Sequence, residues 1–411
     1  MKRLHTLSRN RHARGRASFV CRACSPEFLF SRFPIRVHCL PLRGNRIAWK
    51  TAAERGGAER RGVATNGAAD SDMSADSFSI GIDFGGTNLR LAAYTPASGF
   101  LETIQMPTRL KAGRDAVVAD MCEGIRKLRD TYSAKLSLKG IAIGSPGPIE
   151  LPEGRLRNLP NLPGFDGLEL RTAVEQGVGT PVVVENDANF AALAECVAGK
   201  GKTLGIDTLL FLTLGTGVGG GIIFHGKIWD GLNGMAGEVG HINIWPDGVA
   251  CGCGARGCLE PLASATGVRR RAKELIAEGK SPALAALEKS NPDFTPRDVA
   301  LLASAGDRDA QTIFDEVGLA LGRGLAALVN TLNLPLYVVG GGLSSSWNLF
   351  SPALFEELRY RSYVFRMTDP EKSDAARGTK AKTYVTLTDL GPEAGLLGAC
   401  ILPFTVSPNG A

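Results

Sequence analysis

The chain has 411 residues, of which 44% are hydrophobic and 21% are charged, an ordinary balance for a globular protein of two or three domains. Its net charge of +6 is unevenly spread, because residues 1–72 hold 13 Arg and 2 Lys against 3 Glu and 2 Asp, which leaves the remainder mildly acidic. This balance argues against nucleic acid as a partner of the body of the protein. No run of about 18 apolar residues occurs, so we expect no membrane span.

Residues 1–72 are rich in Arg and show little apolar periodicity. They fit an organellar transit peptide, a basic tail that binds polyanions, or translated upstream sequence with Met73 as the true start. In each case we expect them to be disordered or absent from the mature protein. The nine cysteines do not resemble a disulfide framework, which favours a reducing, cytoplasmic location.

The first predicted motif is a hairpin, with strands at Ser79–Asp83 and Leu89–Tyr94. The two glycines of its turn allow the backbone to approach an anion, and successive N–H groups there form a concave anion site. An ordinary hairpin turn is the alternative interpretation. The candidate phosphate ligands are Gly85, Gly86, Thr87 and Asn88, and Asp83 is a candidate for holding Mg²⁺ through water.

A helix at Ala112–Ser133 and a buried strand at Lys139–Gly144 follow. Asn161 lies in the next, turn-rich segment, where its amide either binds a sugar hydroxyl or serves an ordinary turn. Asp187 lies between a buried strand, Pro181–Glu185, and a helix, Phe190–Ala198. Ligands of α/β sheets bind at such strand ends, so Asp187 is a candidate general base; the alternative role is a helix N-cap.

A second glycine hairpin is predicted from the strand Thr208–Leu214, the glycine run up to Gly221 and the strand Ile222–His225. The run matches the G-x-G-x-x-G pattern of dinucleotide sites, but a strand rather than a helix follows it, so we reject that match. Two such hairpins suggest a duplicated fold that holds phosphate between its halves. The candidate ligands in the second turn are Gly215, Thr216 and Gly217.

Four soft metal ligands follow with the spacing H-x9-C-x-C-x4-C: His241, Cys251, Cys253 and Cys258. A closed Cys3His set suits a tetrahedral structural Zn²⁺ and leaves no position for a reactive water, which argues against a zinc hydrolase. Redox cysteines or buried thiols are the alternative. Glu238 and Glu260 flank the cluster, and we expect the metal to fix these carboxylates around a polyhydroxylated substrate.

The last third is predicted to be helical over residues 262–330, with a buried strand at Leu336–Val339 and a final helix at Gly391–Leu402. A glycine run follows that strand. It allows the backbone to lie against a flat ring such as adenine, with Gly341 and Gly342 as candidate contacts, or it is a bare turn.

These motifs together resemble the ROK family of sugar kinases and repressors. The resemblance rests on DFGGTN at 83–88, ENDAN at 185–189, LGTGVGGG at 214–221, GEVGH at 237–241, CGCGARGCLE at 251–260 and VGGGLS at 339–344. It covers essentially all of 79–402, and the cysteine signature with GEVGH is its most specific part.

The resemblance implies an α/β, actin-like (ribonuclease H-like) ATPase fold, with two similar lobes and a cleft between them. We expect an N-terminal lobe at 73–200, a C-terminal lobe with the zinc site at 201–390, and a final helix, 391–402, that is a candidate to return to the first lobe. Family repressors carry a winged helix-turn-helix before the kinase-like body, and 1–72 shows no such pattern.

The activity implied is transfer of the γ-phosphoryl group of MgATP to the 6-hydroxyl of glucose, in a homodimer. Asp187 is then the base for that hydroxyl, and a carboxylate with an ordinary pKa near 4 can do this because the proton leaves late. A kinase for N-acetylmannosamine, N-acetylglucosamine or fructose, a non-catalytic sugar sensor, and polyphosphate as donor stay open. The resemblance places Asn161, Asn186, Glu238, His241 and Glu260 near the sugar.

Overall fold

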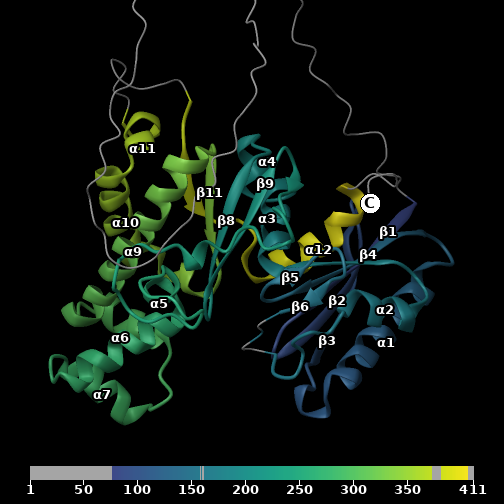
Figure 1. The fold of residues 1–411 in the computed structure, drawn as a ribbon, viewed down its shortest axis with the longest axis horizontal. Coiled ribbons are helices and arrows are strands. Elements are labelled where there is room, and N and C mark those ends of the chain that lie inside the picture. Colours follow the sequence, from purple (N-terminus) through teal and green to yellow (C-terminus); the bar gives the residue numbers. More distant parts are fainter. Residues whose placement is uncertain (1–75, 158, 160–161, 373–380, 406–411) are drawn as a thin grey trace, which may run out of the picture. The chain divides into compact units, whose positions relative to one another are not determined.

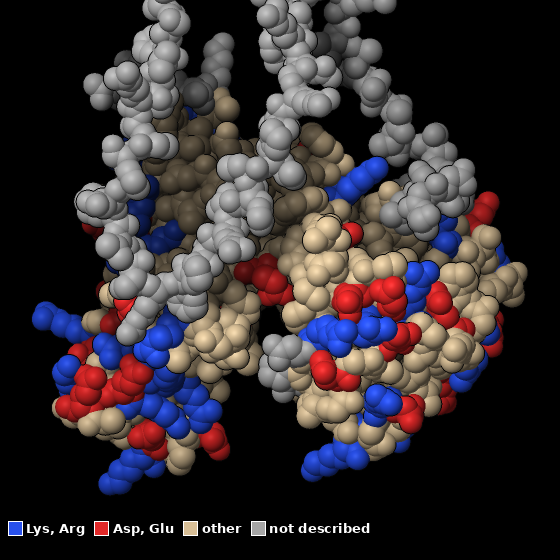
Figure 2. Space-filling model, viewed as in Figure 1, with Lys and Arg blue, Asp and Glu red and all other residues tan. Residues whose placement is uncertain are grey.

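The computed structural model describes residues 76–157, 159, 162–372 and 381–405. The interpretations of residues 1–72 therefore lie outside the described residues, as does Asn161. Within the described ranges, no helix is both long and apolar enough to cross a membrane. Acidic and basic side chains are interspersed on the face shown in Figure 2.

The first sheet has five strands in the order β3-β2-β1-β4-β7 (Figure 1). The pairs β1–β2 and β2–β3 are antiparallel, whereas β1–β4 and β4–β7 are parallel. Its strands are β1 (Ser77–Phe84), β2 (Asn88–Thr95), β3 (Gly99–Pro107), β4 (Ser137–Ser145) and β7 (Val182–Asn186). Two short strands, β5 (Ile149–Glu150) and β6 (Arg155–Leu156), form a separate ribbon.

The second sheet repeats this pattern in the order β10-β9-β8-β11-β12. Again the first three strands along the chain are antiparallel and the last two run parallel to the first of them. Its strands are β8 (Leu209–Leu214), β9 (Val218–Phe224), β10 (Lys227–Ile228), β11 (Leu336–Gly340) and β12 (Tyr384–Leu387). The predicted duplication is therefore present at the level of strand order.

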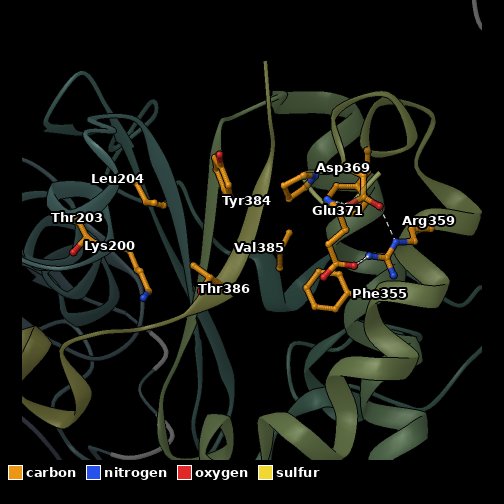
Figure 3. A pocket seen from close by; sticks show the side chains of 12 residues that line it. Lys200, Thr203, Leu204, Phe355, Arg359, Asp369, Glu371, Tyr384, Val385 and Thr386 are labelled. Atoms are coloured by element: carbon orange, nitrogen blue, oxygen red, sulfur yellow. Dashed lines mark hydrogen bonds and ion pairs between the residues drawn. The ribbon is translucent and has the colours of Figure 1, made fainter. Parts of the chain in front are cut away.

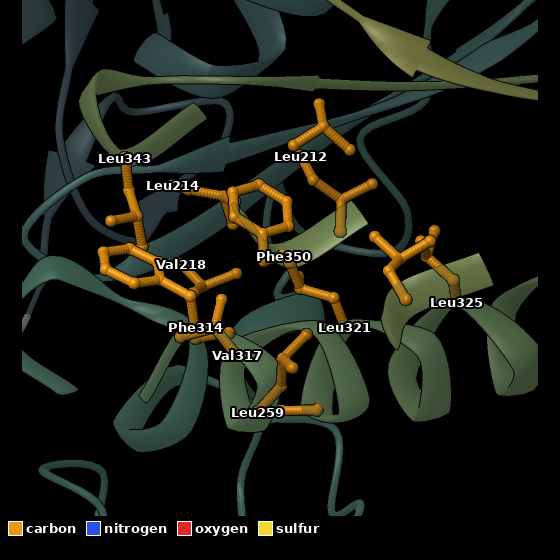
Figure 4. Close-up of a cluster of buried hydrophobic side chains, with 14 of the residues drawn as sticks. Leu212, Leu214, Val218, Leu259, Phe314, Val317, Leu321, Leu325, Leu343 and Phe350 are labelled. Carbon is orange, nitrogen blue, oxygen red and sulfur yellow. The ribbon is translucent and has the colours of Figure 1, made fainter. Parts of the chain in front are cut away.

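Each sheet is covered by helices whose apolar residues recur at helical spacing. On the first sheet, α1 (Arg114–Tyr132) buries Val117, Met121, Ile125 and Leu128. On the second, Phe314, Val317 and Leu321 of α9 pack with strand residues Leu212 and Leu214 (Figure 4). Besides α1, the helices of these layers are α2 (Leu170–Val178), α5 (Glu260–Ala263), α6 (Ala265–Ala277), α7 (Pro282–Ser290), α8 (Pro296–Ser304), α9 (Arg308–Leu332), α10 (Trp347–Arg361) and α11 (Tyr363–Thr368).

Two helices connect the sheets through a shared apolar cluster: α3 (Asp187–Val197) contacts β8 and β9, and α12 (Ala394–Thr405) contacts β1 and β4 (Figure 1). They cross closely, because a Cβ at Gly398 would lie 1.9 Å from the carbonyl oxygen of Phe190. The short helix α4 (Lys200–Leu204) follows α3. The last helix thus packs on the sheet formed by the start of the chain.

The structure corrects the predicted second hairpin, because β9 begins at Val218 rather than at residue 222. Because glycines favour turns, the whole glycine run up to Gly221 is predicted to lie outside the strand. Their smallness instead serves packing: a Cβ at Gly221 would lie 2.5 Å from the carbonyl oxygen of Ala188 in α3. The turn is confined to 215–217. The strands β3 and β12 and the helices α10 and α11 had no counterpart in the sequence analysis.

Candidate functional site

Asp187 opens α3, but it is not the cap of that helix. The N-cap is Asn186, whose side-chain Oδ1 accepts a hydrogen bond from the backbone N–H of Ala188 at 2.9 Å. The Nδ2 of Asn186 donates to the carbonyl oxygen of Gly147, also at 2.9 Å. The alternative role of Asp187 as the N-cap is therefore wrong, and both ends of the Asn186 amide are held by the protein itself.

The carboxyl group of Asp187 lies in an environment that disfavours its charge. Burial, followed by the charges of Asp83 and Glu238, raises its pKa to about 7, although backbone N–H groups at the start of α3 act in the opposite direction. An ordinary pKa near 4 would suffice for a base, but the pKa of Asp187 is raised well above it. The reason is tertiary, because Asp83 and Glu238 come from distant parts of the chain. At neutral pH this carboxyl group is poised between its two protonation states.

Asp83 is held by an arginine that the sequence analysis did not select. Nε of Arg90 donates to Oδ2 of Asp83 at 2.9 Å, and its Nη2 contacts the same oxygen. Nη2 also donates to the carbonyl oxygen of Pro392 at 3.0 Å, just before α12. The signal was available in the hairpin register, where Asp83 and Arg90 face each other across β1 and β2.

The first glycine turn is short and faces solvent. The N–H of Gly85 donates to the carbonyl oxygen of Asn88 at 3.0 Å, and the hydroxyl of Thr108 donates to the carbonyl oxygen of Gly85 at 2.7 Å. Thr87 and Asn88 are exposed at the tip. The turn therefore presents polar groups next to Asp83, at the end of β1.

The second glycine turn is braced by Glu260. Oε2 of Glu260 accepts a hydrogen bond from the N–H of Val218 at 3.1 Å, and a Cβ at Gly217 would lie 2.3 Å from that oxygen. At Gly215, by contrast, no described atom lies within 4 Å of the Cβ position. Thr216 is exposed at the tip, and its carbonyl oxygen accepts from the hydroxyl of Thr266 at 2.8 Å. Glu260 thus links this turn to the cysteine segment.

The four predicted metal ligands lie together: their ligand atoms are all within 4.8 Å of one another. Nδ1 of His241 is 3.6 Å from Sγ of Cys251, and Sγ of Cys253 is 3.8 Å from Sγ of Cys258. A tetrahedral zinc ion with ordinary bond lengths requires about 3.6 Å between a nitrogen and a sulfur ligand and about 3.8 Å between two sulfurs. These residues therefore fit a closed Zn²⁺ site.

Glu238 and Glu260 lie beside this cluster, as the sequence suggested. Nε2 of His241, the ring nitrogen that does not face the cysteines, is 3.9 Å from Oε2 of Glu238. On the other side, Sγ of Cys251 is 3.9 Å from Oε1 of Glu260. A carboxylate next to the second nitrogen of a metal-binding histidine fixes the orientation of the ring. Contacts thus run from Glu238 through the cluster and Glu260 to the second glycine turn.

The glycines after β11 differ from each other. Gly341 has φ +85°, and a Cβ there would lie 2.6 Å from the backbone nitrogen of Leu214, so the fold itself requires glycine at this position. At Gly342 no described atom lies within 4 Å of the Cβ position, and the residue is exposed. Packing does not explain that second glycine, which leaves it the better candidate for a ligand contact.

A pocket of about 240 Å³ lies away from these residues, beside the edge strand β12 (Figure 3). Its walls include Lys200 and Thr203 of α4, Phe355 and Arg359 of α10, and Tyr384 of β12. Arg359 is already paired with Asp369 at 2.7 Å. None of the predicted site residues lines this pocket.

The repeated sheet pattern and the glycine turn at the first hairpin of each sheet define a protein of the actin-like ATPase class. The ROK family model matches residues 79–404, and the chain belongs to the ROK family. A glucokinase from Halalkalibacterium halodurans is 35% identical over 325 residues, which is 79% of this chain and 94% of the relative.

Two solved structures agree with this assignment. The ROK hexokinase from Thermus thermophilus is 30% identical with a TM-score of 0.64, over 79% of this chain and 97% of that one. A ROK glucokinase from Streptomyces griseus, in complex with glucose and AMPPNP, is 31% identical with a TM-score of 0.61, and the match covers 79% of this chain and 99% of that one. The predicted family and fold class are confirmed.

Proposed function

We propose that the protein is an ATP-dependent hexose kinase that phosphorylates glucose at its 6-hydroxyl. The observation that carries the proposal is the position of Asp187, at the start of α3 and close to the carboxylates of Asp83 and Glu238. The relatives described above are named for the same reaction class. ATP is the proposed donor, in keeping with the two glycine turns and with the AMPPNP bound to the Streptomyces griseus relative.

Asp187 is the proposed base. In its ionised form it accepts a hydrogen bond from the sugar hydroxyl, orients the oxygen for attack, and takes the proton as the new O–P bond forms. Because its pKa is raised to about 7, Asp187 is a stronger base than an exposed aspartate. The raised pKa also means that part of the free protein carries a protonated, inactive Asp187 at neutral pH.

The remaining groups position the reactants. We assign sugar hydroxyls to Asn161, Asn186, Glu238, His241 and Glu260, although the amide of Asn186 must share its existing hydrogen bonds to do this. The turns at Gly85–Asn88 and Gly215–Gly217, with Gly342, are assigned to the nucleotide. Backbone N–H groups of such turns stabilise charge on phosphoryl oxygens.

Two metal ions complete the proposal. Mg²⁺, held near Asp83 through water, neutralises charge on the phosphates when it is bound. Zn²⁺ is structural: His241, Cys251, Cys253 and Cys258 hold the segment between Glu238 and Glu260 in shape. We further propose a cytoplasmic homodimer with lobes at 73–200 and 201–390, the final helix packing with the first.

The direct test is a coupled ADP-release assay on the full chain with glucose, N-acetylmannosamine, N-acetylglucosamine and fructose, run with ATP or polyphosphate. We expect the highest kcat/KM for glucose with ATP, and no turnover for the Asp187→Asn variant. Higher kcat/KM for an N-acetylated sugar would move the assignment to that substrate. If none of the four sugars is phosphorylated although sugar still binds, the result would favour a non-catalytic sugar sensor.

A further inference from the structure

One buried acid is used by none of the steps described above. Glu185 precedes Asn186 at the end of β7 and is only 4% exposed. Its Oε1 accepts hydrogen bonds from the N–H of Asn186 at 2.7 Å and from Nδ2 of Asn189 at 2.9 Å. Glu185 therefore holds the first turn of α3, the turn that presents Asp187.

A second acid reaches Glu185 from the loop that follows β10. The carboxyl groups of Glu185 and Asp230 are close enough for each to affect the pKa of the other. Two ionised carboxylates have no proton to share, so a hydrogen bond between them forms only when one of the two groups is protonated. Oδ1 of Asp230 is buried and has no hydrogen-bond partner within the described part of the chain, as expected if this oxygen binds a proton shared with Glu185.

Asp230 also organises its own loop. Its carbonyl oxygen accepts hydrogen bonds from the N–H groups of Gly234 at 3.1 Å and of Ala236 at 3.2 Å. The loop then leads into Glu238, one of the carboxylates that act on Asp187. A side-chain contact at Asp230 therefore anchors the segment that delivers Glu238.

The same loop is attached to the first half of the chain at a second place. The N–H of Leu151 donates to the carbonyl oxygen of Asn233 at 3.1 Å. Gly234 lies so close to β5 that a Cβ there would be 2.5 Å from the carbonyl oxygen of Ile149. The loop is thus seated on β5 by its backbone, and Glu185 is the side chain that ties it to α3.

We propose that Glu185 is a positioning residue that shares one proton with Asp230 and so locks the loop 229–237 against the start of α3, fixing the spacing between Glu238 and Asp187. The inference rests on the proposed function only in so far as Glu238 and Asp187 belong to the site of a sugar kinase. The shared proton itself is a property of the free protein.

Burial and the neighbouring acid support this protonation. Burial first, and then the charge of Asp230, raises the pKa of Glu185, while burial raises that of Asp230. The polar groups that face Glu185 from α3 are the N–H of Asn186 and the amide of Asn189. Charged side chains on adjacent elements are paired elsewhere: Glu175 of α2 with Arg171, and Glu150 of β5 with Arg157.

The shared proton predicts how the stability of the folded protein changes with pH. The folded protein retains the shared proton at pH values where the unfolded chain has lost it, so stability falls as pH rises through the raised pKa. Above that pH the two carboxylates repel each other, and the loop loses its side-chain tie to α3. Activity is then lost in alkaline solution through the sugar site, as a rise in KM more than a fall in kcat.

The test compares Glu185→Gln with Asp230→Ala in the full chain. Glutamine supplies a permanent N–H donor and keeps the acceptor oxygen, so we expect kcat/KM within about threefold of wild type and no alkaline rise in KM. Asp230→Ala removes the partner, and we expect a loss of at least about tenfold at neutral pH. Should Glu185→Gln fail to fold, Asp230→Asn supplies the same donor from the other side.

A second readout needs no substrate. Infrared difference spectra near pH 7 are recorded in the Asp187→Asn background, because the buried Asp187 carboxyl group would itself be partly protonated at this pH. They should show the band of a protonated, buried carboxyl group, and this band should be missing when Glu185→Gln is added. Absence of this band before Glu185→Gln is added, or equal loss of kcat/KM in Glu185→Gln and Asp230→Ala, would overturn the shared proton. If instead every sugar fails as substrate while the band is present, the proposed reaction is wrong and the carboxyl pair stands.

Discussion

Replacing Asp187 by asparagine should make the protein inactive and more stable. The folded protein holds the Asp187 proton up to a pH of about 7, whereas the unfolded chain releases it near 3.8. Between these values the folded state binds more protons, so the ionisable side chain costs stability as pH rises, at about 1.4 kcal/mol per pH unit. Asparagine has no charge to bury and does not carry this cost.

The size of the effect follows from the same two pKa values. Between pH 5 and pH 8, ionisation of Asp187 lowers the free energy of unfolding of wild type by at most about 3 kcal/mol. We therefore expect the difference in free energy of unfolding between Asp187→Asn and wild type to grow by about 1–3 kcal/mol over this range. Urea unfolding of the full chain at both pH values, without sugar or nucleotide, measures it. Asp115→Asn is a matched control, because that side chain is 98% exposed, and its advantage should change by less than about 0.5 kcal/mol.

The same samples separate chemistry from binding. Asp187→Asn should lose nearly all turnover while it binds sugar almost as well as wild type, as measured by calorimetry. If the stability difference between Asp187→Asn and wild type does not grow with pH, burial and the charges of Asp83 and Glu238 do not raise the pKa of Asp187. Retention of more than a few per cent of turnover would refute the assignment of Asp187 as the base.

Three further results are expected. The kcat/KM of wild type should rise with pH through about 7, because Asp187 must be ionised to accept a proton; a flat profile from pH 5.5 to 8 would mean that its pKa is ordinary. Cys253→Ala should lose bound zinc, measured by atomic absorption, and unfold at a lower temperature, whereas Cys196→Ala keeps the metal; full zinc occupancy in the first variant would disprove the site. Gly217→Ala should lower the unfolding temperature because its Cβ meets Glu260, while Gly215→Ala should leave that temperature unchanged and raise KM for ATP; equal unfolding temperatures for the two variants would contradict the brace.

The sequence was most informative where chemistry is set by local spacing. The four metal ligands lie within 18 consecutive residues, so the cluster could be predicted from their order alone. The glycine turns and the position of Asp187 at the junction of a strand and a helix are equally local. Such features depend on backbone geometry over a few residues, which residue types largely determine.

Features that depend on distant contacts were missed or misjudged. The pKa of Asp187 is set by burial and by acids from other segments, and no spacing rule contains that information. The brace from Glu260 to the N–H of Val218 likewise joins residues far apart in the chain. The predicted start of β9 is too late because glycine favours turns, whereas here glycine allows α3 to approach the strand.

The position of α12 has a consequence for how the protein is made. This helix is formed by the final described residues, yet it buries Leu396, Ala399 and Cys400 against β1 and β4, which come far earlier in the chain. A nascent chain still on the ribosome therefore holds an amino-terminal sheet with one apolar face open. A product that ends before residue 394 lacks α12 and leaves that face exposed, and we expect such incomplete copies to aggregate or to bind chaperones.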